Sequence, residues 1–360
     1  MKQHKNIPVD VDRAALIACL KAALFNANIL IDFPAINWNL FCERAHDHGV
    51  ISLLYSPRLK QLPLPHEVAE TIHNHYEACL MYHEYCLQLL RSMAMDLTRF
   101  GRVVLMQGFA LNEQIYKERG LRTGSDVDLL LPDGNLPQVR EVLIKNGFVQ
   151  YDAYRTVLRW QNVFIDLHED LAGSGRIPLR NSLMPATEIQ TVPSTQVDGL
   201  RVLCGASLYR QTALHALKHS CSRLIWACDL AMIHERLQSS ANVLDHVDDD
   251  LNRDRIIRTG FRYATKIFNL SPVPALVPAL EHQSVHERIT SIILNNFSDR
   301  PGIGELALGL CASSWWRTIQ YLGASVFPSK PVLQQMYGTD SWWPLMLRRM
   351  MALIKMVAGK

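Results

Sequence analysis

Residues 122–131 read Arg-Thr-Gly-Ser-Asp-Val-Asp-Leu-Leu-Leu, so two acids stand at the start of an apolar run. Residues i and i+2 of a β-strand point to the same face of the sheet, so a strand here would bring Asp126 and Asp128 together. Two close carboxylates repel each other, and a bound divalent cation relieves that repulsion. Mg²⁺ suits such a pair, with Mn²⁺ as the alternative, because it takes oxygen ligands and shares them with substrate phosphates. Two solvated acids at the end of a loop are the competing interpretation.

A third acid follows in the stretch 161–168, Gln-Asn-Val-Phe-Ile-Asp-Leu-His. Apolar residues alternate here with Phe164, Asp166 and His168, which indicates a strand with a period of two. Two acids on one strand and one on its neighbour can hold two metal ions for an in-line phosphoryl-type transfer. The sequence therefore predicts a metal site formed by Asp126, Asp128 and Asp166. His168 either orients Asp166 or caps the strand.

A short apolar strand at 103–106 is followed by Gln107-Gly108 and then by a helical pattern over residues 110–116. A strand, a glycine turn and a helix N-terminus together offer backbone N–H groups to a phosphate. This turn, with Gln107 and Gly108, and the Gly-Ser turn that contains Ser125 are therefore expected at a nucleotide. Arg122 could bind a phosphate or pair with Asp126, and a purely structural ion pair is an equally good interpretation.

These motifs, in this order, resemble the uncharacterised nucleotidyltransferase family of the DNA polymerase β-like superfamily. Further similar segments are 146–148, His215-Ala-Leu-Lys218-His219, residues 223–229, and Phe327-Pro-Ser with Tyr337. The resemblance runs from roughly Trp38 to Tyr337. It implies an α+β fold, in which a small mixed β-sheet core is flanked by N-terminal and C-terminal helical regions. It also implies that Lys218 binds a phosphate.

The chain departs from the family pattern at the phosphate turn. The family usually has Lys-Gly where this chain has Gln107-Gly108, and other superfamily members often have Gly-Ser where it has Gly108-Phe109. A lysine at this turn could neutralise phosphate charge, whereas glutamine can only form hydrogen bonds. Turnover or nucleotide affinity is therefore reduced here, or another cation replaces the lysine.

Composition narrows the class of protein. The chain has 360 residues, of which 48% are hydrophobic, and its formal charge is +3. Disorder of the whole chain is excluded, and this nearly balanced charge is not a strong nucleic-acid signature. Eight scattered cysteines without a Cys-x-x-Cys pair argue against structural zinc and suit free thiols in the cytoplasm. The first ten residues do not read as a signal peptide.

Periodicity divides the chain into three regions. Residues 1–100 form an N-terminal helical region, with a long helix expected over about 67–100. Residues 101–205 form the nucleotidyltransferase-like α/β core, and residues 206–360 form a C-terminal helical domain. Residues 342–358 mix tryptophans, arginines and apolar residues, so they could contact a membrane surface. A terminal helix packed on the protein is the favoured interpretation.

Other polar residues have structural interpretations that outweigh metal binding. His215 and His219 have the spacing of a zinc pair, but a packed helix is favoured. His73, His75 and His83 are expected to be solvated or capping residues. Asp229 lies in an apolar helix and needs a partner, for which the candidates are Arg223 and Lys218.

The expected function is metal-dependent transfer of a nucleoside monophosphate from an NTP to an unidentified acceptor, which could be a small molecule, a peptide, a protein or an RNA. The alternatives are a catalytically weak nucleotide-binding or regulatory module of the same fold, favoured by Gln107 and Phe109, and a membrane-associated biosynthetic protein.

Overall fold

The computed structural model describes most of the chain between residues 11 and 351. The described residues are 11–25, 36–56, 59, 64–116, 118–151, 156–172, 189–239, 254–271, 283–297, 303–312, 315–326, 330, 333, 343–344, 346–348 and 350–351. The family-like motif around Phe327 and Tyr337 and most of residues 342–358 lie outside them. Within the described part, no helix is both long enough and apolar enough to cross a membrane.

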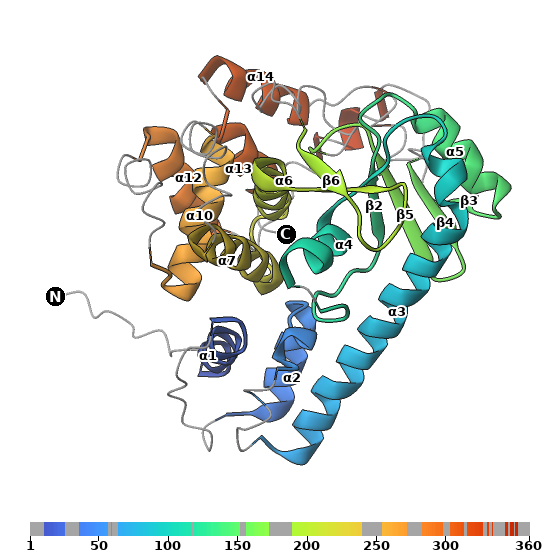
Figure 1. Ribbon diagram of the computed structural model, residues 1–360. Coiled ribbons are helices and arrows are strands. Elements are labelled where there is room, and N and C mark those ends of the chain that lie inside the picture. Colours follow the sequence, from blue (N-terminus) through green and yellow to red (C-terminus); the bar gives the residue numbers. More distant parts are fainter. Residues whose placement is uncertain are drawn as a thin grey trace.

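A seven-stranded mixed sheet, in the order β3-β4-β5-β2-β1-β7-β6, forms the centre of the fold (Figure 1). Only β2–β5 and β1–β7 are parallel pairs, and the other neighbours are antiparallel. The strands are β1 (Val104–Leu105), β2 (Val127–Leu130), β3 (Val149–Gln150), β4 (Val157–Trp160), β5 (Val163–His168), β6 (Thr191–Pro193) and β7 (Arg201–Leu203).

The parallel pair β2–β5 lies in the middle of the sheet and is mostly buried. All four residues of β2 are buried, which explains its continuous apolar run. The register places Asp128 opposite Asp166 and Leu130 opposite His168. Between the two strands the chain forms α5 (Leu136–Lys145) and the antiparallel pair β3–β4. The two acids are thus neighbours across the ladder although they are far apart in sequence.

The turn after β1 leads directly into a short helix. Helix α4 spans Gln107–Leu111 and continues as a π-helical turn, η4 (Asn112–Tyr116). Gln107 has a φ of 47°, a left-handed conformation that non-glycine residues seldom adopt. The strand–turn–helix order predicted for this segment is confirmed, but the helix begins at Gln107 rather than at Ala110.

Helices precede the sheet in the chain. They are α1 (Val11–Phe25), α2 (Trp38–Asp47), the 3₁₀ turn η2 (Ser52–Leu54) and α3 (His66–Thr98). With 33 residues, α3 is about 50 Å long, and it runs from beside α2 to the edge of the sheet near β4 (Figure 1). The long helix expected over about 67–100 is confirmed.

A second group of helices follows the sheet: α6 (Gly205–Lys218), α7 (Leu224–Ser239), α10 (Arg255–Phe268), α12 (Val285–Phe297), α13 (Ile303–Leu310) and α14 (Trp315–Val326). Helix α6 is buried along nearly all of its length and packs against α7, α10 and α13. The α+β architecture expected from the sequence is confirmed. The division into three regions at residues 100 and 205 stays a prediction, although all seven strands lie between Val104 and Leu203.

The N-terminus of α12 carries a buried acid with several partners. Glu287 accepts hydrogen bonds from Arg258 Nε at 2.8 Å, Arg262 Nη1 at 2.7 Å and the Ser284 backbone N–H at 2.9 Å. The Glu287 backbone N–H in turn donates to Ser284 Oγ at 3.3 Å, which completes a capping box, and Ser284 Oγ donates to Glu287 Oε2 at 2.6 Å. Burial alone would raise the pKa of Glu287, but these hydrogen bonds outweigh it and hold the pKa at about 2.

We expect Glu287→Gln to lower the free energy of unfolding at pH 7 by about 3 kcal/mol, because the two arginines lose their buried counter-charge. A depressed carboxyl pKa stabilises the fold above the ordinary pKa and loses this effect as the pH falls. The difference between wild type and variant should therefore shrink by about 2 kcal/mol between pH 5 and pH 3. Urea unfolding at several pH values measures this difference in the free energy of unfolding, with the exposed Glu70→Gln variant as control. A difference that does not change with pH would contradict this account.

Candidate active site

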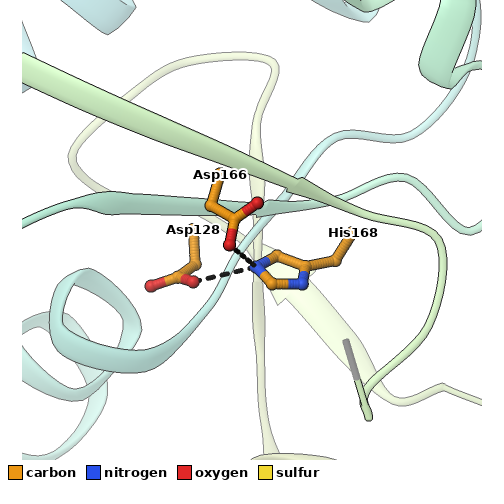
Figure 2. A group of neighbouring side chains, drawn as sticks. All are labelled: Asp128, Asp166 and His168. Carbon is orange, nitrogen blue, oxygen red and sulfur yellow. Dashed lines mark hydrogen bonds and ion pairs between the residues drawn. The ribbon is translucent and has the colours of Figure 1, made fainter. Parts of the chain in front are cut away.

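Two acids and a histidine converge on the central strands. Asp128 on β2 and Asp166 on β5 face each other across the parallel ladder, and His168 follows Asp166 by two residues on the same face. One ligand atom from each of the three lies within 4.8 Å of the others. His168 Nε2 is 2.9 Å from Asp128 Oδ1 and 3.5 Å from Asp166 Oδ2 (Figure 2). Asp128 and His168 are buried, and Asp166 is partly exposed.

Asp128 is held by two polar neighbours. Gln107 Nε2 donates to Asp128 Oδ1 at 2.8 Å, and His168 Nε2 lies against the same oxygen. The left-handed backbone of Gln107 starts α4 beside β2, where its side chain reaches the carboxylate. Gln107 therefore interacts with the acid cluster in this structure.

The charge of His168 responds to the acids around it. Burial alone would lower its pKa, but the hydrogen bond to Asp128 and the charges of Asp128 and Asp166 outweigh that effect, so the pKa is raised. A protonated His168 would supply positive charge between the two carboxylates. The sequence pattern Asp-x-His on a strand already placed His168 beside Asp166, but it gave no sign of the contact with Asp128.

Asp126 lies one residue before β2 and outside the group of three. Ser125 Oγ donates to its Oδ1 at 3.0 Å. Burial raises the pKa of Asp126 to about 6, the charges of Asp128 and Asp166 add to this, and Ser125 and Arg122 act in the opposite direction. The three acids thus repel one another, as expected for a site that takes up a cation.

A cavity of about 660 Å³ opens beside these acids, which is within the usual range for small-molecule sites. Its walls come from the turn at Gly108, the loop 122–126, β5, the end of α6 and the N-terminal helices. All eight residues singled out from the sequence line it: Gln107, Gly108, Arg122, Ser125, Asp126, Asp128, Asp166 and Lys218.

Arg122 forms a buried ion pair whose partner the sequence analysis did not identify. Its Nε lies 3.1 Å from both oxygens of Asp229 on α7, and its Nη2 lies 2.9 Å from Oδ2. Tyr116 Oη donates to Asp229 Oδ1 at 2.9 Å. The expected partners of Asp229, Arg223 and Lys218, are thus replaced by Arg122 and Tyr116. The structural ion pair proposed for Arg122 is present, with Asp229 as its partner rather than Asp126.

The loop that carries Asp126 is hydrogen-bonded to other parts of the fold. Thr123 Oγ1 donates to the Gly49 carbonyl at 2.7 Å, and Tyr82 Oη on α3 donates to the Ser125 carbonyl at 3.0 Å. Asn112 pairs with the backbone of Arg122 through both its side-chain atoms, at 2.9 and 3.2 Å. The position of Asp126 therefore depends on residues from α3, η4 and the turn after α2.

The helical side of the cavity is basic and aromatic. The rings of His215 and His219 lie 4.7 Å apart, and His219 stacks on Trp226 at 5.1 Å. The guanidinium of Arg223 lies 6.0 Å from the Trp226 ring centre. The packed arrangement favoured for His215 and His219 is observed, although both rings also line the cavity.

The N-terminal helices contribute residues that the sequence analysis missed. His46 at the end of α2 and His75 on α3 line the cavity, with their rings 5.3 Å apart. No local pattern marks them, because they belong to helices far from the acids in sequence. The expectation that His83 is solvated or capping is wrong: it is 4% exposed, stacks on Phe109 at 4.5 Å and lies 3.3 Å from Gln196 Oε1.

The donor set suits a divalent cation. It offers carboxylate oxygens from two strands and an imidazole nitrogen within 4.8 Å of one another. Burial, together with the charges of Asp128 and Asp166, raises the pKa of the neighbouring Asp126. Carboxylates are ligands of Mg²⁺ and Mn²⁺, and imidazole is more typical of transition metals. Asp128 and Asp166, with Asp126 or His168, could therefore hold such an ion.

Comparison with known proteins places the chain in a family. The sequence model of a family described as uncharacterised nucleotidyltransferase matches residues 34–269 of the 360. No curated protein and no solved structure matches significantly. The match covers more than half of the chain and includes the turn at Gly108, the acidic strands and helices α6 and α7. The chain therefore belongs to the uncharacterised nucleotidyltransferase family.

Proposed function

We propose that the protein transfers a nucleoside monophosphate from an NTP to the hydroxyl of an unidentified acceptor, and that this transfer depends on a divalent metal. The observation that carries the proposal is the in-register pairing of Asp128 with Asp166 at the wall of a nucleotide-sized cavity. Membership of a nucleotidyltransferase family supports the reaction class.

Asp126, Asp128 and Asp166 are the proposed metal ligands and catalytic residues. Asp128 Oδ1 already accepts from Gln107 and His168, so Oδ2 is the atom that we assign to the metal. A bound Mg²⁺, or Mn²⁺, supplies positive charge that stabilises the attacking and the leaving oxygen. His168 orients Asp128 through its hydrogen bond.

In the proposed step the acceptor oxygen forms a bond to the α-phosphorus of the NTP, while the bond from that phosphorus to the bridging oxygen of the β-phosphate breaks. Pyrophosphate leaves with the bond's electron pair. The acceptor hydroxyl loses its proton, which we assign to the Asp166 carboxylate because Asp166 is more exposed than Asp128. Positioning and charge stabilisation account for most of the catalysis in reactions of this kind.

The nucleotide phosphates are assigned to the turn at Gln107-Gly108, with Ser125 and Lys218 nearby in the same cavity. A methyl group added at Gly108 would lie 3.6 Å from Arg122 Nη1 and from Gly124 Cα, so close approach by a ligand rather than folding explains the glycine. Asp229 neutralises Arg122, so Arg122 fixes the loop while Lys218 supplies the charge for phosphate.

The second candidate function is a catalytically weak nucleotide-binding or regulatory module. Gln107 favours it, because the side chain here is neutral and donates to Asp128. For the whole chain we propose three domains, 1–100, 101–205 and 206–360, and a cytoplasmic location, which its eight free thiols support. The partners are an NTP and the acceptor. Peripheral membrane contact through residues 342–358 has no support in the described part of the chain.

The first prediction tests catalysis. Incubation with each α-labelled NTP, Mg²⁺ and cell extract should transfer label to an acceptor, and Asp128→Asn should lower the rate about a thousandfold or more, because a metal ligand loses its charge. The exposed Asp198→Asn is the matched control. Nucleotide binding without any transfer in wild type would favour the binding module instead.

Another prediction concerns the charged form of Asp126, which burial and the neighbouring acids disfavour. In EDTA at pH 7.5, Asp126→Asn should raise the free energy of unfolding by on the order of 1 kcal/mol, because the charged form is disfavoured in the fold. A raised carboxyl pKa means that stability is lost as the pH rises through about 6, so the gain should vanish below pH 4. Stabilisation by added Mg²⁺ should be weaker in the variant. Thermal and urea unfolding measure both effects, and Asp198→Asn should show neither.

The third prediction concerns the missing lysine. Gln107→Lys should change NTP affinity by less than about fivefold, because Lys218 already supplies positive charge to the phosphates. Fluorescence titration with an NTP analogue measures it, with Gln88→Lys on the exposed face of α3 as control. A marked rise in turnover would instead identify the natural chain as a weakened enzyme.

A further inference from the structure

The cavity is divided by charge. Of the described residues that line it, only Asp126, Asp128 and Asp166 carry a carboxylate, and all three lie at the sheet. The helical side carries six basic or titratable side chains: His46, His75, His215, Lys218, His219 and Arg223. The proposed metal and NTP phosphates account for the acids and for Lys218. They leave the remainder of the basic side without a function.

This basic part lies on a different wall from the acids. His46 and His75 come from α2 and α3, and Arg223 stands just before α7. The pKa of His75 is lowered by burial and by His46, with no carboxylate among the causes. Lys218, by contrast, is the last residue of α6 and is already assigned to the NTP phosphates. We therefore separate His46, His75, His219 and Arg223, here called the basic wall, from the phosphate-binding groups.

Arg223 is held in place before any ligand binds. Its Nε donates to the Asp47 carbonyl at 3.0 Å, and its guanidinium lies over Trp226, on which His219 also stacks. Gly49 approaches it so closely that an added Cβ would be 2.6 Å from Nη2, and the φ of 67° at this position also favours glycine. Such a fixed guanidinium can bind a phosphate or carboxylate with little loss of side-chain entropy.

Like charges are crowded along this side of the cavity. The pKa of Arg223 is lowered by burial and by the charge of Arg122, while Asp47 acts against this. The Asp47 carboxylate also lies 3.7 Å from His46 Nδ1, but the Asp47 side chain is 72% exposed and does not line the cavity. A bound anion would compensate this positive charge, as a cation would compensate the acids at the sheet.

We propose that the basic wall binds an anionic group of the acceptor, a phosphate or a carboxylate, and so directs the acceptor hydroxyl toward Asp166. The inference rests on the proposed function, because it concerns the second substrate of that reaction. It restricts the acceptor to molecules that carry a negative charge at some distance from the hydroxyl that reacts. An uncharged acceptor would leave Arg223 with only the exposed Asp47 carboxylate as a counter-charge.

Inorganic phosphate is the probe for this site, and histidine side-chain NMR of the full chain is the measurement. At constant pH and ionic strength, phosphate should shift the ring signals of His46, His75 and His219 along one saturable curve. Arg223→Gln should weaken this binding at least tenfold, Arg223→Lys should weaken it less, and the exposed Arg99→Gln should leave it unchanged. Acetate in place of phosphate distinguishes a carboxylate site from a phosphate site.

A second titration, with a non-hydrolysable NTP analogue and Mg²⁺ at saturation, separates this inference from the proposed function. Phosphate should still bind, because the analogue is assigned to the other wall. Displacement by the analogue would assign the basic wall to the triphosphate and overturn the proposal, as would the absence of saturable shifts or an unchanged affinity in Arg223→Gln. Failure of the analogue to bind would count against the proposed function alone, because the first titration measures phosphate binding in the absence of the analogue.

Loss of the bond to Asp47 could unfold Arg223→Gln, so its thermal unfolding is measured alongside. The His219→Gln variant keeps Arg223 and its bond to the Asp47 carbonyl, and it should weaken phosphate binding several-fold. Full affinity in a folded His219→Gln protein would overturn the proposal, just as full affinity in a folded Arg223→Gln protein would.

Discussion

Two carboxylates placed side by side in a largely buried part of a sheet are costly, and much of the surrounding structure offsets that cost. Asp128 and Asp166 lie opposite each other because β2 and β5 are parallel and in register. Burial in a medium of low dielectric strengthens their repulsion. The Gln107 amide and the His168 ring donate to Asp128. Burial is the main cause of the raised pKa of Asp126, and the charges of Asp128 and Asp166 add to it. A strained electrostatic arrangement of this kind is typical of sites whose purpose is binding rather than stability.

The loop between η4 and β2 is fixed by a second buried charge pair. Arg122 binds Asp229 through two nitrogens, and Tyr116 completes the shell of the same carboxylate. Buried ion pairs contribute little net stability, but losing one partner leaves an uncompensated charge that is strongly destabilising. The pair therefore sets where the loop stands relative to α7. It links the acids at the sheet to the helix that begins beside Arg223.

Local patterns predicted the elements, and long-range pairing decided the details that they left open. The period of two around Asp166 and the apolar run after Asp128 predicted β5 and β2, and the long helix expected over about 67–100 is α3. The partner of Asp229 lies 107 residues away in sequence, so no periodicity could identify it. The same holds for His83, whose ring is buried against Phe109 and Gln196, and for the histidines of α2 and α3 at the cavity. The spacing of the carboxylates on predicted strands suggested the metal ligands. The residues of the opposite wall of the cavity could be identified only from the tertiary structure.

The hydrogen bonds of Thr123 and Tyr82 hold the loop that carries Asp126, and they limit which fragments of the chain could keep a functional site. Thr123 holds the Gly49 carbonyl and Tyr82 holds the Ser125 carbonyl, so both ends of the turn before Asp126 are tied to the N-terminal helices. In the described part of the chain, the seven strands of the sheet lie on one continuous piece of sequence, and this piece would look like a self-sufficient catalytic module. Such a fragment would retain every acid but lose the external supports that set the direction of Asp126. The smallest working unit is therefore larger than the sheet and must include α2 and α3.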